Sequence, residues 1–271
     1  MGNLNFKYGT LIRGGPKTLN GGKWDATLKE YVRNAHTNAD LSIQIRVYFA
    51  KISPALGRTG LHGDHDDTPT KPSKKKIQMW APGEFESFTS RLVRQAQRYW
   101  DGVFWLQTPQ RYTELNWPDE RPTHRCHLYC RFELNQVQAE PDSHYTIAVV
   151  RVQDSEGFFR SDAKLYSQRD IQSEYMIPHS TVKFWTYFHE VGHLLGLGHI
   201  GYAQHHNLHN DGSPKAYGVT KHEMQDVMGR GHARHAWHAL PWREAAEDFT
   251  KIVANDWVVH MHHIVPNHLH A

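Results

Sequence analysis

The run HEVGHLLGLGH, which spans residues 189–199, constrains this chain more than any other segment. Residues four positions apart lie about one turn apart on a helix, so the rings of His189 and His193 point the same way. Gly196 predicts an abrupt end to that helix, because a left-handed backbone costs glycine little. The resulting turn brings His199 back toward the other two rings. The motif therefore predicts three imidazoles that converge on one metal ion.

Zinc and a neighbouring base follow from the same motif. Neutral imidazoles bind zinc at about 2.0–2.1 Å, and three protein ligands leave a fourth position for water, as in catalytic zinc sites. Glu190 directly follows the first ligand, close enough to touch a zinc-bound water without coordinating the metal. We therefore predict one Zn2+ ion held by His189, His193 and His199, with Glu190 as the catalytic base.

The high histidine content is the competing explanation. With 22 histidines in 271 residues, a bare HExxH pattern arises by chance in roughly one such chain in ten. Requiring Gly196 and His199 at their offsets lowers that chance to about one in two thousand. We expect most other histidines to be surface or hydrogen-bonded residues or part of an exposed C-terminal tail. These are His205, His206, His209, His222, His232, His235, His238, His260, His262, His263, His268 and His270.

Length and composition restrict the class of protein. A chain of 271 residues with 39% hydrophobic content and nine tryptophans suffices for one large domain or two lobes around a cleft. The net charge of +3 is too small to indicate nucleic acid as the main partner. No apolar run approaches the roughly 18 residues of a membrane span. The first ten residues lack the apolar stretch of a secretory signal, so we expect a cytoplasmic protein at synthesis or one exported by a leaderless route.

Periodicity divides the chain into expected elements. Residues 1–40 are rich in Gly, Lys and Asn without a clear period, and we interpret them as a loosely structured lead-in. A catalytic domain is expected over 41–271, with an N-terminal lobe to residue 199. Alternating apolar residues in LSIQIRVYF predict a strand with one buried side over 41–49. The other predicted elements are strands 126–134, 145–152 and 163–167, helices 85–99 and 241–255, and a helix that begins at Ser180 as its N-cap and continues into the histidine motif.

Residues 53–76 combine the run HGDHDD with three prolines and the triplet Lys74–Lys76. This composition favours a solvated loop or insertion. The alternative is a second metal site, whose ligands would be His62, Asp64, His65, Asp66 and Asp67.

The only two cysteines, Cys126 and Cys130, fall within one predicted strand. Four residues along a strand separate their backbones by about 13 Å, beyond the ~7 Å limit for a disulfide. We therefore expect free thiols, although a helical segment would bring the pair within disulfide range.

The motif HEVGHLLGLGH resembles the zinc signature of the metzincin metalloproteases. That family carries a methionine in a tight turn beneath the zinc, before a C-terminal helix, and Met228 in QDVMGRG occupies that place 29 residues after His199. Met224 is the alternative for this place, and the alternative role for Met228 is that of an ordinary core methionine. The resemblance implies a two-lobed α+β fold with a twisted, mixed and mostly parallel sheet, an active-site helix and a C-terminal helix. It also implies an edge strand that binds an extended peptide by backbone pairing, which residues 163–167 would supply.

Two positions depart from the family pattern. Ile200 follows the third histidine and matches none of the acidic, serine or proline forms that mark metzincin groups, so no subfamily is assigned. Arg230 stands where some groups carry a tyrosine that stabilises the transition state. Arg230 either donates to the oxyanion or forms a structural ion pair, which we favour, and His232 or His235 is a further candidate for oxyanion contact. No cysteine-switch propeptide is visible, so an inhibitor or immunity protein, or delivery into another compartment, would control the enzyme.

The resemblance implies a zinc-dependent endopeptidase whose substrate is a protein or peptide. Two alternatives remain at this point. One is a zinc-binding protein on a protease scaffold with a blocked or repurposed cleft, which the intact Glu190 disfavours. The other is a zinc hydrolase of a non-peptide amide. A leaderless metalloprotease of this kind would also suit an exported effector or toxin.

Overall fold

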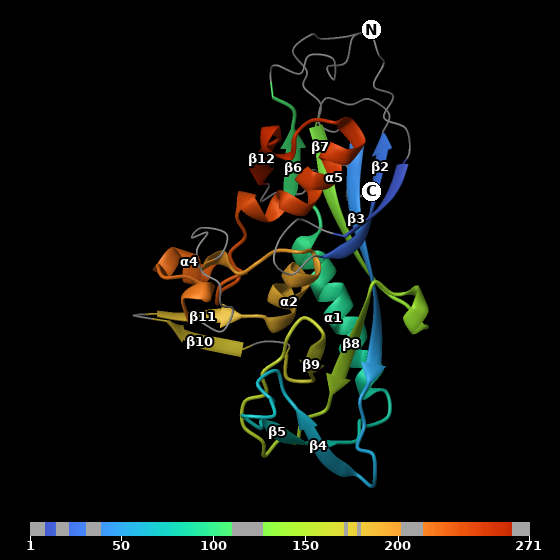
Figure 1. The fold of residues 1–271 in the computed structure, drawn as a ribbon, viewed down its shortest axis with the longest axis vertical. Helices are drawn as coiled ribbons and strands as arrows, with labels where there is room; N and C mark the ends of the chain where they lie inside the picture. Colours follow the sequence, from blue (N-terminus) through green and yellow to red (C-terminus); the bar gives the residue numbers. More distant parts are fainter. Residues whose placement is uncertain are drawn as a thin grey trace.

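The centre of the fold is a curled mixed sheet, which has eight strands within the described residues (Figure 1). The computed structural model describes residues 9–14, 22–30, 39–109, 127–170, 173–177, 180–201 and 214–261. Six strands follow one another in the order β1 (Gly9–Gly14), β2 (Lys23–Glu30), β3 (Ala39–Lys51), β7 (His127–Gln136), β6 (Phe104–Gln107) and β12 (Val258–Met261). Two more, β8 (Tyr145–Val150) and β9 (Leu165–Ser167), extend it from β3.

Strand β3 joins the two parts of this sheet. It pairs with β2 antiparallel and with both β7 and β8 parallel. Its side chains alternate as predicted, because Leu41, Ile43, Ile45 and Val47 are fully buried while the residues between them are half-buried. The predicted strand is confirmed, and so are the strands at β7, β8 and β9.

Two of the predicted helices pack on this sheet. Helix α1 (Glu84–Trp100) buries Phe88, Leu92 and Ala96 and packs against β7 and α2, and α5 (Leu240–Thr250) packs against β3. The helix α2 (Thr186–Leu194) carries the histidine motif. The short helical segments are η2 (Glu140–Asp142), η3 (Pro214–Tyr217), α4 (Lys221–Gln225), η4 (Ala236–Ala239) and η5 (Ala254–Asp256). None of the helices in the described residues has the length and apolar character that a bilayer crossing requires.

The lead-in prediction is wrong for residues 23–30, which form β2. Trp24, Ala26 and Leu28 alternate with polar residues, and all three side chains are buried in the main core. The polar and glycine-rich segments on both sides obscured this short period-two pattern. Residues 9–14 are also extended and pair with β2.

The predicted start of the motif helix is wrong as well. Ser180–Phe184 is a strand, β11, which pairs antiparallel with β10 (Ser173–Ile177), and the helix begins only at Thr186. The β-branched Thr181 and Val182 favour the extended state. The expectation of a mostly parallel sheet also fails, because four of the seven strand pairings described in the large sheet are antiparallel.

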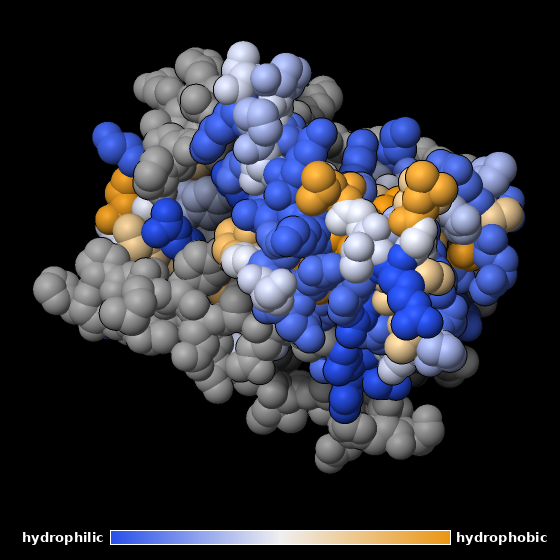
Figure 2. Space-filling view, turned by 90° about the horizontal axis from the view of Figure 1, so that it is seen from below, coloured by the Kyte–Doolittle hydropathy of each residue, from blue (hydrophilic) through white to orange (hydrophobic). Residues whose placement is uncertain are grey.

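Residues 53–76 are mostly exposed but include a hairpin, β4 (Thr59–Gly63) and β5 (Lys74–Gln78). Figure 2 views the end of the molecule that carries this hairpin, where single apolar residues lie among hydrophilic ones. The acidic and histidine side chains of the loop bind protein groups: His65 pairs with Asp162 at 3.0 Å, and Asp66 with Arg160 at 2.7 Å. Among the described residues, the group with metal-ligand geometry is His189, His193 and His199, and no residue of this loop belongs to it. The alternative of a second metal site in the loop is therefore not supported.

Several predicted features lie outside the described residues. Cys130 is a free, buried thiol, whereas Cys126 is not described. The histidines within residues 202–213 and those after residue 261 also lie outside the described residues. His260, predicted to lie in an exposed tail, is exposed but belongs to β12 and bonds to Gln107 at 3.1 Å.

Candidate metal centre

The end of α2 places the three histidines of the motif. Leu197 N–H donates to Gly192 O and Gly196 N–H to His193 O, each at 2.9 Å, which is the bonding pattern of a glycine-terminated helix end. Gly196 has φ of 93°, a left-handed conformation in which a side chain would be strained. The predicted helix end is confirmed, and it turns the chain so that His199 approaches α2.

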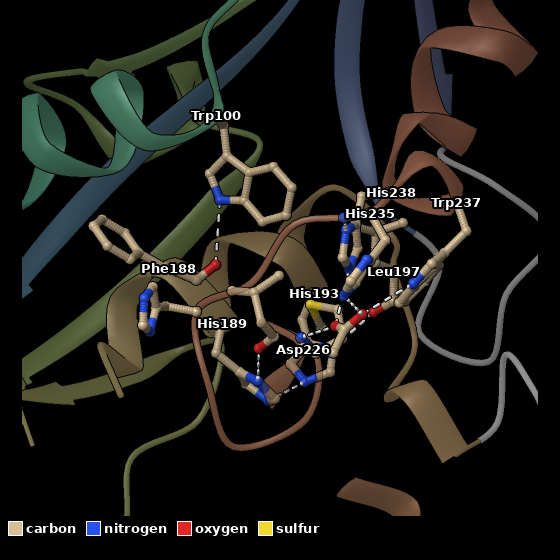
Figure 3. Close-up of polar contacts among 12 residues, drawn as sticks. Trp100, Phe188, His189, His193, Leu197, Asp226, His235, Trp237 and His238 are labelled. Carbon is tan, nitrogen blue, oxygen red and sulfur yellow. Dashed lines mark hydrogen bonds and ion pairs between the residues drawn. The ribbon is translucent and has the colours of Figure 1, made fainter. Parts of the chain in front are cut away.

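The three imidazoles converge as predicted, and Figure 3 shows the first two, His189 and His193. The Nε2 atom of His193 lies 3.1 Å from Nε2 of His189 and 3.1 Å from Nε2 of His199. One ligand atom from each ring lies within 4.8 Å of the other two. His189 and His199 are buried, and His193 is half-buried.

Two backbone carbonyls fix the tautomers of the first two rings. His189 Nδ1 lies 2.7 Å from Val227 O, and His193 Nδ1 lies 2.8 Å from Leu197 O. A carbonyl oxygen can only accept, so each Nδ1 carries the proton and each Nε2 carries a lone pair. Two lone pairs 3.1 Å apart repel each other unless a cation lies between them. This pair of nitrogens is therefore arranged for a metal ion rather than for a hydrogen bond to each other.

Burial keeps the same rings neutral. It is the main cause that holds the pKa of His189 well below its ordinary value, and the neighbouring His193 and His199 add to it. Burial likewise lowers the pKa of His193 to about 4 and that of His199 to about 3. At neutral pH the ring nitrogens thus remain available as ligands.

The spacing of the nitrogens agrees with a small tetrahedral ion. Three nitrogens bound at about 2.05 Å in tetrahedral geometry would be about 3.3 Å apart. The two measured separations of 3.1 Å are close to that value. The residues present therefore fit a metal ion with imidazole ligands.

Glu190 lies one residue along α2 from the first ligand and is itself buried. Burial raises the pKa of its carboxyl well above the ordinary value, and the charges of Asp162 and Asp170 raise it further. Asp162 lies three residues before the start of β9 at Leu165, and Tyr166 of β9 also interacts electrostatically with Glu190. Strand β9 therefore borders the candidate site.

Met228 occupies a turn that packs against α2. It is fully buried, and a Cβ atom built on Gly192 would lie 2.3 Å from its sulfur atom, so the methionine fills the space that this glycine leaves. Backbone carbonyls of the turn also bond to the segments that carry the three histidines. Val227 O accepts from His189 Nδ1–H, and Met228 O accepts from Ile200 N–H at 3.1 Å. The rival residue, Met224, lies in α4.

Arg230 and His232 occupy different places beside this site. The Arg230 guanidinium lies over the ring of Tyr217, 5.6 Å from its centroid, and Tyr217 in turn packs on His199 at 4.3 Å. The His232 ring lies edge-on against Trp185, the residue before α2. Neither belongs to the ligand cluster.

Sequence reasoning missed several residues that surround the histidines. Tyr217 ends the short helix η3 and Arg160 lies in a loop, neither with a periodic signal, and the two interact electrostatically next to His199. Asp226, which is 1% exposed, bonds the Met228 N–H two residues later. Aspartate side chains in turns commonly bond to the backbone N–H two residues later, so the sequence Asp-Val-Met could have indicated this bond.

Together the fold and the site define an α+β protein with three histidines that are able to hold one metal ion. No family model, no curated protein and no solved structure matches this chain.

Proposed function

We propose that this protein is a zinc-dependent endopeptidase of the metzincin kind. The observation that carries the proposal is a buried glutamate one residue along the helix from a cluster of neutral, converging imidazoles. The glycine-terminated helix end and the buried methionine beside Gly192 favour the metzincin arrangement among zinc hydrolases.

The residues of the site would divide the chemistry as follows. His189, His193 and His199 hold the ion, and their low pKa values keep the nitrogens unprotonated at neutral pH. Zinc, when bound, supplies a Lewis acid that lowers the pKa of a coordinated water and polarises the scissile carbonyl. Glu190 accepts the proton of the attacking water and passes it to the leaving nitrogen.

A protein or peptide substrate would lie along β9. Among the described strands, β9 pairs only with β8, and the residues at and before it interact electrostatically with Glu190. An extended peptide that added to this strand would replace the bonds that Leu165 and Ser167 make to Asp162 and Asp170, and it would pass next to the base. Tyr217, whose ring packs on His199, puts a phenol beside the histidine cluster and interacts electrostatically with Arg160.

The test is cleavage of a peptide library by the zinc-loaded protein, with and without a chelator, beside the Glu190→Gln variant. We expect chelator-sensitive cleavage by the wild type and a loss of roughly 10²–10⁴-fold in Glu190→Gln, the size of a general-base contribution. Zinc content, measured by mass spectrometry, should stay equal in both proteins. Glu86→Gln, which removes a carboxylate from the exposed side of α1, is the matched control and should retain full activity. Full proteolysis by Glu190→Gln, or no peptide cleavage by zinc-loaded wild type, would overturn the proposal.

A further inference from the structure

A continuous set of hydrogen bonds leads from the first histidine of the cluster into the interior. His189 Nδ1–H donates to Val227 O at 2.7 Å, and Met228 N–H donates to Asp226 Oδ1 at 2.6 Å. Val227 C=O and Met228 N–H belong to the same peptide unit. They point in opposite directions because that unit is planar and trans. One side of this peptide thus holds the histidine ring, and the other side bonds to Asp226.

Asp226 is itself held from several directions (Figure 3). Trp237 Nε1–H donates to its Oδ2 at 3.0 Å, and His238 Nε2–H donates to Oδ1 at 3.0 Å. The direction of the second bond is fixed, because His235 N–H donates to His238 Nδ1 and leaves the proton on Nε2. Asp226 is 1% exposed and His238 is 0% exposed. A carboxylate without room to turn therefore fixes the orientation of the Val227–Met228 peptide.

We propose that Asp226 is a positioning residue for the metal, acting through the Val227–Met228 peptide on His189. The inference rests on the metal site of the proposed function. An acceptor on the N–H side of a peptide polarises the unit and makes its carbonyl a better acceptor for the imidazole proton. That carbonyl holds the tautomer and the direction of the ring whose Nε2 faces the ion. Outer hydrogen-bond partners of this kind commonly change metal affinity when they are removed.

A purely structural role is the competing explanation. Asp226 also closes its own turn, since its carbonyl accepts from Gly229 N–H at 2.9 Å and Gly231 N–H at 3.1 Å. An anchor of that kind would affect unfolding, but it would leave metal affinity unchanged in molecules that remain folded. The two roles therefore separate when affinity is measured on folded protein.

The decisive variant is Asp226→Asn, which keeps the size of the side chain but has only one acceptor oxygen. One orientation of the amide turns its N–H2 group toward Met228 N–H and His238. The other turns it toward Trp237 and leaves Met228 N–H on a neutral amide oxygen, which polarises the peptide less than the carboxylate does, whereas Trp237→Phe keeps the carboxylate charge. We expect a 10–100-fold loss of affinity for Zn2+ and Co2+, measured by competition with a chromophoric chelator at pH 7.5. The visible absorption of the Co2+ form should also change, because the field of the His189 nitrogen changes. Circular dichroism establishes that the variant is folded.

Trp237→Phe is the matched control. It removes the donor to Oδ2 and leaves the Oδ1 bond to Met228, so its metal affinity should stay within about threefold of wild type, well short of the loss expected for Asp226→Asn. Folded Asp226→Asn with wild-type affinity would overturn the inference, and so would equal losses in both variants. Wild-type protein that binds neither metal would instead defeat the proposed function on which the inference rests.

If the Asp226→Asn variant does not fold, a measurement on the wild-type protein tests the same inference. The amide signals of Met228 and Gly229 can be followed by NMR during a Zn2+ titration. The inference requires a larger shift at Met228, whose N–H lies in the bonded path, than at Gly229, whose N–H donates to the Asp226 backbone carbonyl. An unmoved Met228 signal in metal-saturated protein would overturn it.

Discussion

The contact between Gly192 and Met228 allows a sharp test of the turn beside the histidines. A Cβ atom at Gly192 would lie 2.3 Å from the Met228 sulfur, 3.2 Å from its Cε and 3.4 Å from Trp100 Cζ2. Met228 and Trp100 are both fully buried, so the sulfur has little room to retreat. Gly192→Ala therefore has to move the methionine or the helix.

Two opposing effects set the magnitude for Gly192→Ala. Alanine in place of glycine inside a helix stabilises by about 1 kcal/mol. Overpacking a buried site costs about 1–3 kcal/mol. The net loss is then between zero and about 2 kcal/mol, or up to roughly 8 °C in Tm for a chain near this size. Met228→Ala alone leaves a cavity and should cost about 2–5 kcal/mol.

The double variant distinguishes the energy of this specific contact from unrelated losses of stability. In Gly192→Ala/Met228→Ala the new methyl group enters the space that the methionine leaves. The double variant should therefore be less destabilised than the sum of the single variants, by about 0.5–3 kcal/mol. Urea unfolding with a chelator present measures all four proteins without a contribution from bound metal. Strictly additive losses would refute the contact.

Two further predictions concern the surroundings of α2. Burial, which outweighs hydrogen bonds from Ser161 and Ser167, raises the pKa of Asp170 to about 6. The folded protein therefore binds a proton that the unfolded chain has already released near pH 4, so wild type should lose about 2 kcal/mol relative to Asp170→Asn between pH 4.5 and 7.5. A pH-independent difference in unfolding free energy would contradict this. Gly22→Ala places a Cβ atom 2.5 Å from Leu194 O, at the end of α2, and should destabilise by about 1–3 kcal/mol. Gly157→Ala, with nothing within 4 Å, should melt like wild type.

Local periodicity predicted the elements whose environment is uniform along their length. The strand at β3 has one face against the core throughout, and α1 presents one apolar stripe to β7, so their patterns could be identified directly. The end of α2 was also predictable, because one residue, Gly196, determines it. These features depend on residues close together in the chain.

The features that sequence reasoning missed depend on distant partners. Ser180–Phe184 is extended because it pairs with Ser173–Ile177, and a single pattern of apolar residues did not distinguish that pairing from a helix. Likewise, Gly22 lies against the backbone of Leu194 and Gly196, far along the chain. Such a close approach requires glycine, but a lone glycine in a glycine-rich segment gives no indication of it.

The candidate site depends both on residues close together in the chain and on distant partners. Its ligand nitrogens come from an 11-residue run, so the sequence identified them. Their protonation, however, depends on where the carbonyls lie, and Val227 O reaches His189 across 38 residues of chain. The same motif without this turn would still fix the tautomer of His193 through Leu197 O, but not that of His189. The turn at 226–229 therefore helps to orient the first histidine of the ligand cluster, although none of its atoms belongs to that cluster.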